Sequence, residues 1–391
     1  MGLRLLVVLR HWRDPSTGNQ DDGSIIVPGW ELFILAMMKT AYFYGGKDIR
    51  VVEEEIPVIG PSEVLFKVMS AGVCGSDLHN YRGHRIREDV PWQQGHELSG
   101  EIAGLGEGVK GLEIGQRIGI EAEHLLGCGD CRLCRDGQYH LCSDRGVRQG
   151  VRHSSHGFSQ YDVCIAENVT VLPDGVSFDA AALVDCYACA VHAMNRVPDV
   201  SGQSVAIIGA GAIALTLGQV LKANGAGEVI LIGTRQQSVD VAVASGSTDV
   251  GVVTAVDDPV KAVLLATGGE GVSMTFETVG GQLQLVQQAV EMTRRGGVVS
   301  ILGLFTKSQT IDPAMAMERE ITLQWSNSFS SWNGASEFST ALDLVESGRV
   351  IAESIVTHHF GLDEISEAFA IADDKRTSGA IRVMVRPWGV G

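Results

Sequence analysis

Val205-Ala-Ile-Ile-Gly-Ala-Gly-Ala-Ile-Ala214 is the part of this chain that says most about its architecture. The first four residues are all apolar, which is typical of a short buried strand in a parallel sheet. The last six follow the pattern G-x-G-x-x-A and open a helical stretch that is closed by Gly225. Such a turn lets the backbone approach a pyrophosphate, which then meets the free N–H groups of the helix N-terminus. The sequence therefore predicts a dinucleotide site on Gly209, Gly211 and Ala214.

Further apolar runs follow at the intervals expected of alternating strands and helices. They cover residues 229–232, 273–276, 298–302 and 321–325. This alternation predicts a doubly wound parallel sheet of the Rossmann type, so the expected fold class is α/β. Before residue 204 the pattern differs, because short runs such as residues 63–68 alternate apolar and polar side chains between many glycines. That pattern predicts a β-rich half.

The composition is that of a globular chain with an acidic surface. The 391 residues are 45% hydrophobic and 20% charged, enough for two or three domains of roughly 150 residues. The net charge of −17 and the pI of about 5.0 repel phosphate backbones, so nucleic acid is not an expected partner. No secretory signal is evident, and no apolar run reaches the ~20 residues of a membrane helix. We therefore expect a cytoplasmic protein without membrane contact.

Four cysteines cluster in the run Cys128-Gly-Asp-Cys-Arg-Leu-Cys-Arg-Asp-Gly-Gln-Tyr-His-Leu-Cys142. This C-x2-C-x2-C-x7-C spacing can close a tetrahedral zinc site with no open position, which is typical of structural zinc. The predicted ligands are Cys128, Cys131, Cys134 and Cys142. An iron–sulfur electron carrier is a remote alternative, because the gap of seven and the lack of proline after Cys142 depart from the ferredoxin pattern.

Two more motifs lie upstream of the cysteine cluster. They read Gly72-Val-Cys-Gly-Ser-Asp-Leu-His79 and Gly95-His-Glu97. Together with the cysteine cluster and the glycine-rich turn, they resemble the zinc-dependent branch of the medium-chain dehydrogenase/reductase family. That branch includes the alcohol, polyol and threonine dehydrogenases. The resemblance runs from about Met38 to Pro387.

The resemblance implies a discontinuous, GroES-like catalytic domain of residues 38–193 and 331–391, and a Rossmann domain of residues 194–330. Residues 1–37 precede the usual family start, and we expect a disordered arm or a misplaced start codon there. The implied reaction is hydride transfer between a secondary alcohol or polyol, or the matching ketone or aldehyde, and a nicotinamide cofactor. A threonine-dehydrogenase-like enzyme acting on an amino alcohol is the alternative. Relatives are dimers or tetramers, so a homodimer or homotetramer with two zinc ions per chain is expected.

The resemblance also assigns a catalytic zinc site. Cys74 and His96 are two of its ligands, and a third comes from just before the Rossmann domain. Asp185 takes that place in the alignment with the family, and Cys186 is the runner-up. Glu97 either binds the zinc itself or lies behind it.

A proton must leave such a site during alcohol oxidation. Ser76 and His79 match the relay positions of the family, so the expected catalytic residues are Ser76, His79 and Glu97. The four-cysteine site does not need a histidine ligand. The histidines without motif support are expected in loops or on the surface, and they are His84, His124, His153 and His156.

Cofactor preference depends on the residues at the end of the second Rossmann strand. An NAD site usually presents an acid there, whereas this chain reads Ile232-Gly-Thr-Arg235. The stretch resembles the Gly-Ser-Arg of NADP-dependent members, so Gly233, Thr234 and Arg235 are expected to favour NADP over NAD. Arg382 matches a family arginine that contacts the pyrophosphate.

Overall fold

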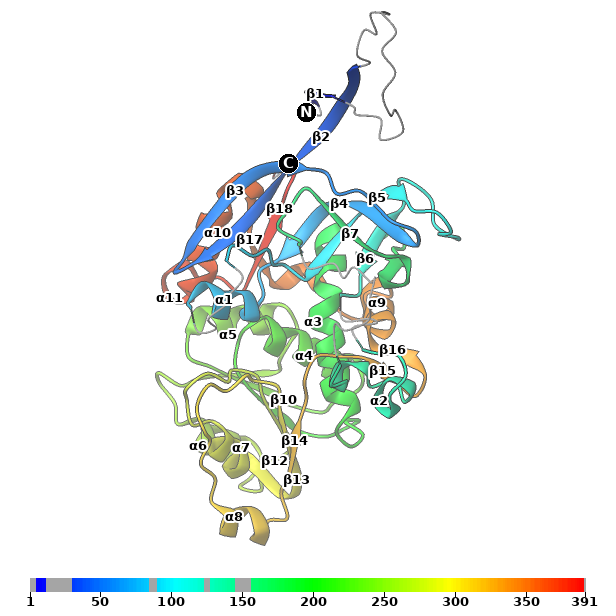
Figure 1. Cartoon of the computed structure of the whole chain (residues 1–391). Coiled ribbons are helices and arrows are strands. Elements are labelled where there is room, and N and C mark those ends of the chain that lie inside the picture. Colours follow the sequence, from blue (N-terminus) through cyan, green and yellow to red (C-terminus); the bar gives the residue numbers. More distant parts are fainter. Residues whose placement is uncertain (1–4, 12–29, 84–89, 123–126, 145–155, 390–391) are drawn as a thin grey trace, which may run out of the picture.

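Two large sheets organise the chain (Figure 1). The computed structural model describes residues 5–11, 30–83, 90–122, 127–144 and 156–389. Within these ranges, one large sheet is parallel throughout, and the other is mostly antiparallel. The sheets occupy different parts of the molecule in Figure 1, and helix α3 (Phe178–Asn195) lies between them.

The parallel sheet has the strand order β11-β10-β9-β12-β13-β14. Its strands are β9 (Val205–Ile208), β10 (Val229–Gly233), β11 (Val250–Val253), β12 (Val272–Glu277), β13 (Thr293–Ile301) and β14 (Thr322–Trp325). All neighbouring strands in this order are parallel. The central strands β9 and β10 are buried along their whole length, which explains their apolar sequences. The predicted doubly wound α/β fold is therefore confirmed.

Helices connect the parallel strands. They are α4 (Ala212–Ala223), α5 (Gln236–Ala244), α6 (Pro259–Ala266), α7 (Val286–Met292) and α8 (Pro313–Glu318). Gly225 follows α4 with a φ of 81°, a left-handed conformation that glycine adopts without strain, so this helix ends as predicted. Both α6 and α8 begin with proline after an aspartate whose side chain accepts N–H groups of the first turn.

The second large sheet has the order β17-β18-β4-β5-β6-β8, and β7 pairs with β4. Its strands are β4 (Glu63–Gly72), β5 (Glu97–Leu105), β6 (Arg117–Ile120), β7 (Tyr161–Ile165), β8 (Val169–Val171), β17 (Val356–Gly361) and β18 (Arg382–Arg386). Met384 pairs with Gly72, so the end of the chain is built into the same sheet as residues 63–72. The core side chains Phe66, Ile102 and Ile118 are fully buried.

Shorter elements surround this sheet. They are α1 (Gly75–Tyr81), α2 (Arg132–Arg135), η1 (Tyr139–Leu141), η2 (Ala166–Asn168), β15 (Ser331–Trp332), β16 (Ala335–Ser336), α9 (Glu337–Glu346), η3 (Ala352–Ile355), η4 (Leu362–Glu364), α10 (Ile365–Asp373) and α11 (Lys375–Ser378). The long helix α3 packs against α4, α9 and β5. Because it contacts both halves of the molecule, α3 is buried over most of its length.

The N-terminal segment forms a hairpin that projects from the body (Figure 1). Strand β1 (Leu5–His11) pairs with the first half of β2 (Trp30–Gly45), and the second half of β2 pairs with β3 (Asp48–Glu55). The backbone therefore passes Met38 within one strand. Residues 1–4 and 12–29 of the N-terminal extension lie outside the described residues. No helix in the described part of the chain is long and apolar enough to span a membrane.

Candidate active site

Strand pairing brings Cys74 and His96 together. The last residue of β4, Gly72, is the direct partner of the first residue of β5, Glu97. Cys74 follows β4 as the N-cap of α1, and His96 directly precedes β5. As a result, the ligand atoms of Cys74, His96 and Glu97 all lie within 4.8 Å of one another. A thiol, an imidazole and a carboxylate are the donor types that zinc takes in proteins.

The charges of Cys74 and His96 support each other. Burial raises the pKa of the Cys74 thiol, but the charge of His96 and a hydrogen bond with it outweigh burial and bring this pKa to about 5. Burial lowers the pKa of His96, but Cys74, Asp77 and Asp185 raise it well above its ordinary value. These opposite shifts favour a thiolate beside an imidazolium when no cation is bound. A divalent cation fits here, because it can replace the imidazole proton as the counter-charge of the thiolate.

Asp77 is a further site residue, which was not among those predicted from the sequence. Its Oδ2 accepts the backbone N–H of Cys74 at 2.9 Å, and its Oδ1 lies 4.0 Å from Nδ1 of His96. Burial raises the pKa of Asp77 to about 7, although the charge of His96 acts in the opposite direction. A carboxylate behind a metal-binding imidazole orients the ring. In the sequence, Asp77 lies within the motif of residues 72–79 and stands three residues after Cys74, about one helical turn away.

Glu97 and Arg382 form a buried ion pair close to Cys74. Their exposed fractions are 1% and 3%. The guanidinium of Arg382 also donates to the carbonyl of Val73 at 3.0 Å and to Sγ of Cys186 at 3.0 Å. The thiol of Cys186 donates to Oε1 of Glu97 at 3.3 Å. These contacts occupy the guanidinium beside the metal-binding residues, and its expected pyrophosphate contact stays a prediction.

The two candidates for the third zinc ligand have different surroundings. Asp185 and Cys186 are both buried in α3. Asp185 lies close enough to His96 to raise the pKa of the imidazole. Among the described residues, however, its carboxylate is not in the group whose ligand atoms lie within 4.8 Å of one another. The Cys186 thiol faces the ion pair of Glu97 and Arg382. Ligation by Asp185 stays a prediction.

The expected proton relay lies on α1. The hydroxyl of Ser76 forms a hydrogen bond with the Cys74 thiol and lowers its pKa. His79 lies one turn further on and is half-buried, in the last turn of the helix. Residues three apart share a helix face, so both side chains lie on one side of α1. His84, His124 and His153 lie outside the described residues, and Nδ1 of His156 lies 3.5 Å from Oδ1 of Asp162.

The predicted structural ligands lie in residues 127–142, which we call the cysteine lobe. The Sγ atoms of Cys128, Cys131, Cys134 and Cys142 all lie within 4.8 Å of one another, and none is in a disulfide. Backbone N–H groups near Cys131 bring the pKa of Cys128 to about 7, whereas burial raises the pKa of Cys134 to about 12. Neighbouring thiolates repel one another, so all four cannot ionise together without a cation. The donor set fits zinc.

Buried polar side chains hold the cysteine lobe against the body. Tyr139 donates its hydroxyl to Oε1 of Glu121 at 2.7 Å. The ring of His140 packs edge-on against that of His192, with centroids 4.9 Å apart. Nδ1 of His192 lies 2.7 Å from Oε2 of Glu337. The lobe is thus docked on Glu121 and on α3, whose His192 is in turn held by Glu337 of α9, through contacts that residue spacing does not reveal.

The glycine-rich turn has the geometry of a phosphate-binding turn. Gly209 has a φ of 125°, and a Cβ there would lie 2.3 Å from Oγ1 of Thr278. At Gly211, by contrast, a Cβ would meet no described atom within 4 Å, although this glycine is the N-cap of α4. No side chain of the described residues caps that N-terminus. The space and the free N–H groups fit a pyrophosphate, and Ala214 is buried where α4 packs on the sheet.

The end of β10 is close to the catalytic half of the chain. Thr234 is exposed, and Nη1 of Arg235 donates to the backbone carbonyl of Lys375 in α11. Burial lowers the pKa of Lys375, and the charges of Arg82 and Arg235 lower it further. A Cβ on Gly233 would lie 2.7 Å from Cγ2 of Val239, so packing alone already favours glycine at this position.

Known protein families and relatives match most of the chain. The alcohol dehydrogenase GroES-like domain matches residues 60–174, and the zinc-binding dehydrogenase domain matches residues 212–347. Sorbitol dehydrogenase of Bacillus subtilis is 30% identical over 355 residues, which cover 90% of this chain and 97% of that protein. L-threonine 3-dehydrogenase of Pyrococcus horikoshii is 33% identical over 353 residues, which cover 89% of this chain and 98% of that protein.

A solved structure shows the same fold with a cofactor. The crystal structure of a Sinorhizobium meliloti 1021 protein bound to NADP superimposes with a TM-score of 0.80 and 26% sequence identity. The match covers 90% of this chain and 100% of the other. The two proteins therefore share the overall fold over most of this chain.

Proposed function

This chain belongs to the zinc-dependent medium-chain dehydrogenase family, and on that premise we propose which of its residues carry out the reaction. Members of the family transfer hydride between alcohols or polyols and a nicotinamide cofactor, so the chain is an NAD(P)-dependent oxidoreductase of this class. The observation that carries the residue assignment is the convergence of Cys74, His96 and Glu97 at the start of β5.

Some residues of the metal site bind the zinc directly, and others hold these ligands in place. Cys74 and His96 bind the catalytic zinc, and Asp185 completes the set from α3, supported by its electrostatic contact with His96. A zinc ion held there supplies Lewis acidity, which lowers the pKa of a substrate hydroxyl. Asp77 holds the His96 ring in place. Glu97 stays behind the site, because Arg382 and Cys186 already occupy its two carboxylate oxygens.

Ser76 takes the proton that the substrate loses. Its hydroxyl already lies at the Cys74 thiol, so it is close to the place where the substrate oxygen would bind. His79 passes the proton on towards water from the same helix face. We expect Ser76→Ala to lower kcat by about two to four decades, the usual share of a general acid–base group. His79→Gln should lower kcat less, and added buffer base should partly restore it.

NADP is the preferred cofactor in this proposal. No acid follows Ile232 to bind the ribose hydroxyls of NAD, and Arg235 can turn from the Lys375 carbonyl to a 2′-phosphate. Arg235 is the positive charge on which this preference depends, because burial and the charge of Arg235 itself lower the pKa of the neighbouring Lys375. A charge-assisted hydrogen bond contributes about 1.5–3 kcal/mol, which is one to two decades in affinity. That is enough to set a preference without excluding NAD.

The cofactor assignment is tested by steady-state kinetics with both cofactors. Arg235→Ala should raise the KM for NADP⁺ about tenfold or more and leave the KM for NAD⁺ nearly unchanged. Arg295→Ala is the matched control, because Arg295 also donates to a backbone carbonyl of the Rossmann half. A higher kcat/KM of the unaltered enzyme with NAD⁺ would refute the NADP preference. Gly233→Asp is a poor test, since its Cβ would collide with Val239.

Substrate choice is tested by absorbance at 340 nm. Polyols, secondary alcohols and amino alcohols are offered in parallel with NAD⁺ and NADP⁺. We expect the highest kcat/KM with a polyol or a secondary alcohol, in line with the match to sorbitol dehydrogenase. A clear preference for threonine would instead support the amino-alcohol alternative, which the match to L-threonine 3-dehydrogenase favours.

We also propose the domain boundaries of the chain, its oligomeric state and its cellular location. Residues 38–193 and 331–391 form the catalytic domain, and residues 194–330 form the cofactor domain, since the strands of the two large sheets divide in this way. A homodimer or homotetramer in the cytoplasm is inferred from the family and from the clustered free thiols. Light scattering on the purified protein tests the oligomeric state.

A further inference from the structure

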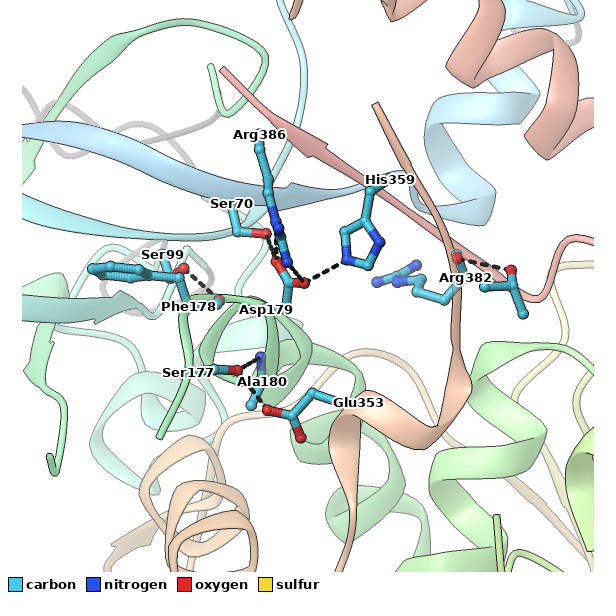
Figure 2. Close-up of polar contacts among 11 residues, drawn as sticks. Ser70, Ser99, Ser177, Phe178, Asp179, Ala180, Glu353, His359, Arg382 and Arg386 are labelled. Carbon is cyan, nitrogen blue, oxygen red and sulfur yellow. Dashed lines mark hydrogen bonds and ion pairs between the residues drawn. The ribbon is translucent and has the colours of Figure 1, made fainter. Parts of the chain in front are cut away.

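A buried carboxylate outside the metal-binding group collects an unusual number of donors. Asp179 lies in the first turn of α3 and is 5% exposed. It accepts hydrogen bonds from Ser70 Oγ at 2.5 Å and from Arg386 Nη2 at 2.6 Å, and His359 Nε2 lies 2.7 Å from its Oδ2. Figure 2 shows these three side chains converging on Asp179 from three different strands. One carboxylate therefore ties α3 to β4, β17 and β18.

The same helix face carries a second set of contacts nearer to the metal-binding group. Cys186 stands seven residues after Asp179, which places it two turns further on the same face of α3. Its thiol contacts Glu97 and Arg382. The contacts of Asp179 and those of Cys186 thus join α3 to the sheet at two places along the helix.

The distance between Asp179 and Cys186 along α3 is similar to the distance between their partners Arg386 and Arg382 along β18. Seven residues of helix span about 10.5 Å. Arg382 and Arg386 are four residues apart in β18, which is about 13 Å, and side chains an even number apart lie on one face of a strand. The helix and the strand can therefore make both contacts only in one register. A slip of α3 would break both sets and move Asp185, which lies directly before Cys186.

The position of Cys74 depends on the same anchor. Ser70 stands four residues before Cys74, and β4 is held to β18 by pairing of Gly72 with Met384. A contact at Asp179 therefore acts on the strand that leads into Cys74 and on the helix that carries Asp185.

We propose that Asp179 is a positioning residue that sets the register of α3 and thereby holds Asp185 and Cys186 at the proper distance from Cys74 and His96. This inference deepens the proposed function and rests on its catalytic metal site. The charge of the side chain is essential, because the guanidinium of Arg386 would otherwise lie half-buried without a counter-ion. Arg386 and Ser70 hold the pKa of Asp179 below its ordinary value against the opposing effect of burial, so the carboxylate is ionised at neutral pH.

The test compares zinc retention in variants of the full-length enzyme. Asp179→Asn keeps the shape of the side chain and removes its charge. Zinc released to a chromophoric chelator is followed over time, and turnover is measured in the same samples. The two sites are distinguished because loss of the catalytic zinc abolishes turnover, whereas loss of the zinc of the cysteine lobe does not. We expect the catalytic zinc to bind about 10–100-fold more weakly, as when other supporting partners of metal ligands are removed, while the zinc of the cysteine lobe is unchanged. Asp363→Asn is the matched control, since Asp363 is an exposed aspartate paired with Lys39.

The outcomes separate positioning from simple stability. An equal loss of zinc from both sites, in step with a lower melting temperature, would overturn the proposal, and so would retention equal to that of Asp363→Asn. If Asp179→Asn does not fold, Ser70→Ala removes one hydrogen bond and keeps the pair of Asp179 with Arg386. Selective weakening of the catalytic zinc in that variant supports the proposal, and unchanged retention overturns it. The unaltered enzyme is the check on the proposed function, because finding one zinc per chain there, and none in Cys128→Ser, would place that zinc in the lobe and refute the catalytic site itself.

Discussion

The cysteine lobe and the catalytic metal site use similar side chains but are assembled in opposite ways. The lobe takes all four donors from residues 128–142, so closing it requires only a short loop. The catalytic site takes Cys74 and His96 from the adjacent ends of two paired strands and, in our proposal, Asp185 from a helix more than eighty residues further along. A local site depends mainly on its own ligands. A site gathered from distant segments depends also on every contact that sets their register.

The largest effect is expected from removing a catalytic ligand. Cys74→Ala should lower kcat by about three decades or more, because Lewis acidity contributes several kcal/mol and each 1.36 kcal/mol is tenfold in rate. Elemental analysis should find one zinc per chain instead of two, with the zinc of the lobe retained. Two zinc ions in this variant would contradict the assignment of Cys74.

A smaller but diagnostic difference is expected between two neighbours on α3. Asp185→Ala should remove the catalytic zinc and nearly all turnover. Cys186→Ala should lower kcat only about tenfold, in the range found for residues that support metal ligands, since its thiol contacts Glu97 and Arg382. Zinc content and kcat of both variants are measured side by side. The reverse ranking would move the third ligand to Cys186.

Loss of the zinc in the cysteine lobe should affect stability and leave the catalytic site nearly unchanged. Cys128→Ser should lower the free energy of unfolding by roughly 3 kcal/mol or more, because binding of structural zinc contributes directly to folding. The kcat per folded molecule should change less than twofold. Denaturant unfolding and active-site titration check the two parts. A large loss of kcat in folded protein would mean that the lobe controls the catalytic site through α3.

The smallest effect concerns the docking of the lobe and depends on pH. Burial raises the pKa of Glu337, but its contact with His192 outweighs burial and lowers the pKa below the usual value. The stabilisation is therefore complete above the unfolded pKa of about 4.3 and is lost as the pH falls through the lower folded pKa. Glu337→Gln should cost about 1.5–3 kcal/mol at pH 7.

Unfolding curves from pH 7 down to pH 3 test this reasoning. The stability difference between Glu337→Gln and the unaltered protein should shrink only in the acidic part of that range. Asp258→Asn is a suitable control, because Asp258 is an exposed helix cap whose pKa is also lowered. A difference that is constant over the whole range would show that the charge of Glu337 does not stabilise the docked lobe.

Local patterns predicted the elements that local forces form. The apolar runs of β9 and β10, the turn from Gly209 to Gly211 and the helix end at Gly225 all lie where the sequence placed them. Strand β11 was not predicted from the sequence, because it has only four residues and contains Gly251 and therefore shows no distinct periodic pattern. Its partner β10 supplies the pairing that makes it a strand.

The roles of several site residues follow only from contacts between distant segments. The pyrophosphate contact of Arg382 stays a prediction, and the sequence did not indicate that its guanidinium also binds Glu97 and the Val73 carbonyl. Asp77 lies within the motif of residues 72–79 but received no role there, and Asp179 lies in no recognised motif; the importance of each is visible only when His96 or Arg386 lies beside it. Burial adds to this effect, since a charge removed from water must find a partner wherever the fold provides one.

The chain alone specifies its four-cysteine site, its phosphate-binding turn and its family, because those depend on residue type at short and fixed spacing. Three-dimensional packing sets which oxygen, nitrogen and sulfur atoms meet around Cys74, because strand register and helix register bring together residues that are more than three hundred positions apart. Spacing in sequence controls local geometry through the stiffness of the backbone. Contacts at long range depend on how whole faces of helices and sheets are buried against one another. No single sequence motif contains that information.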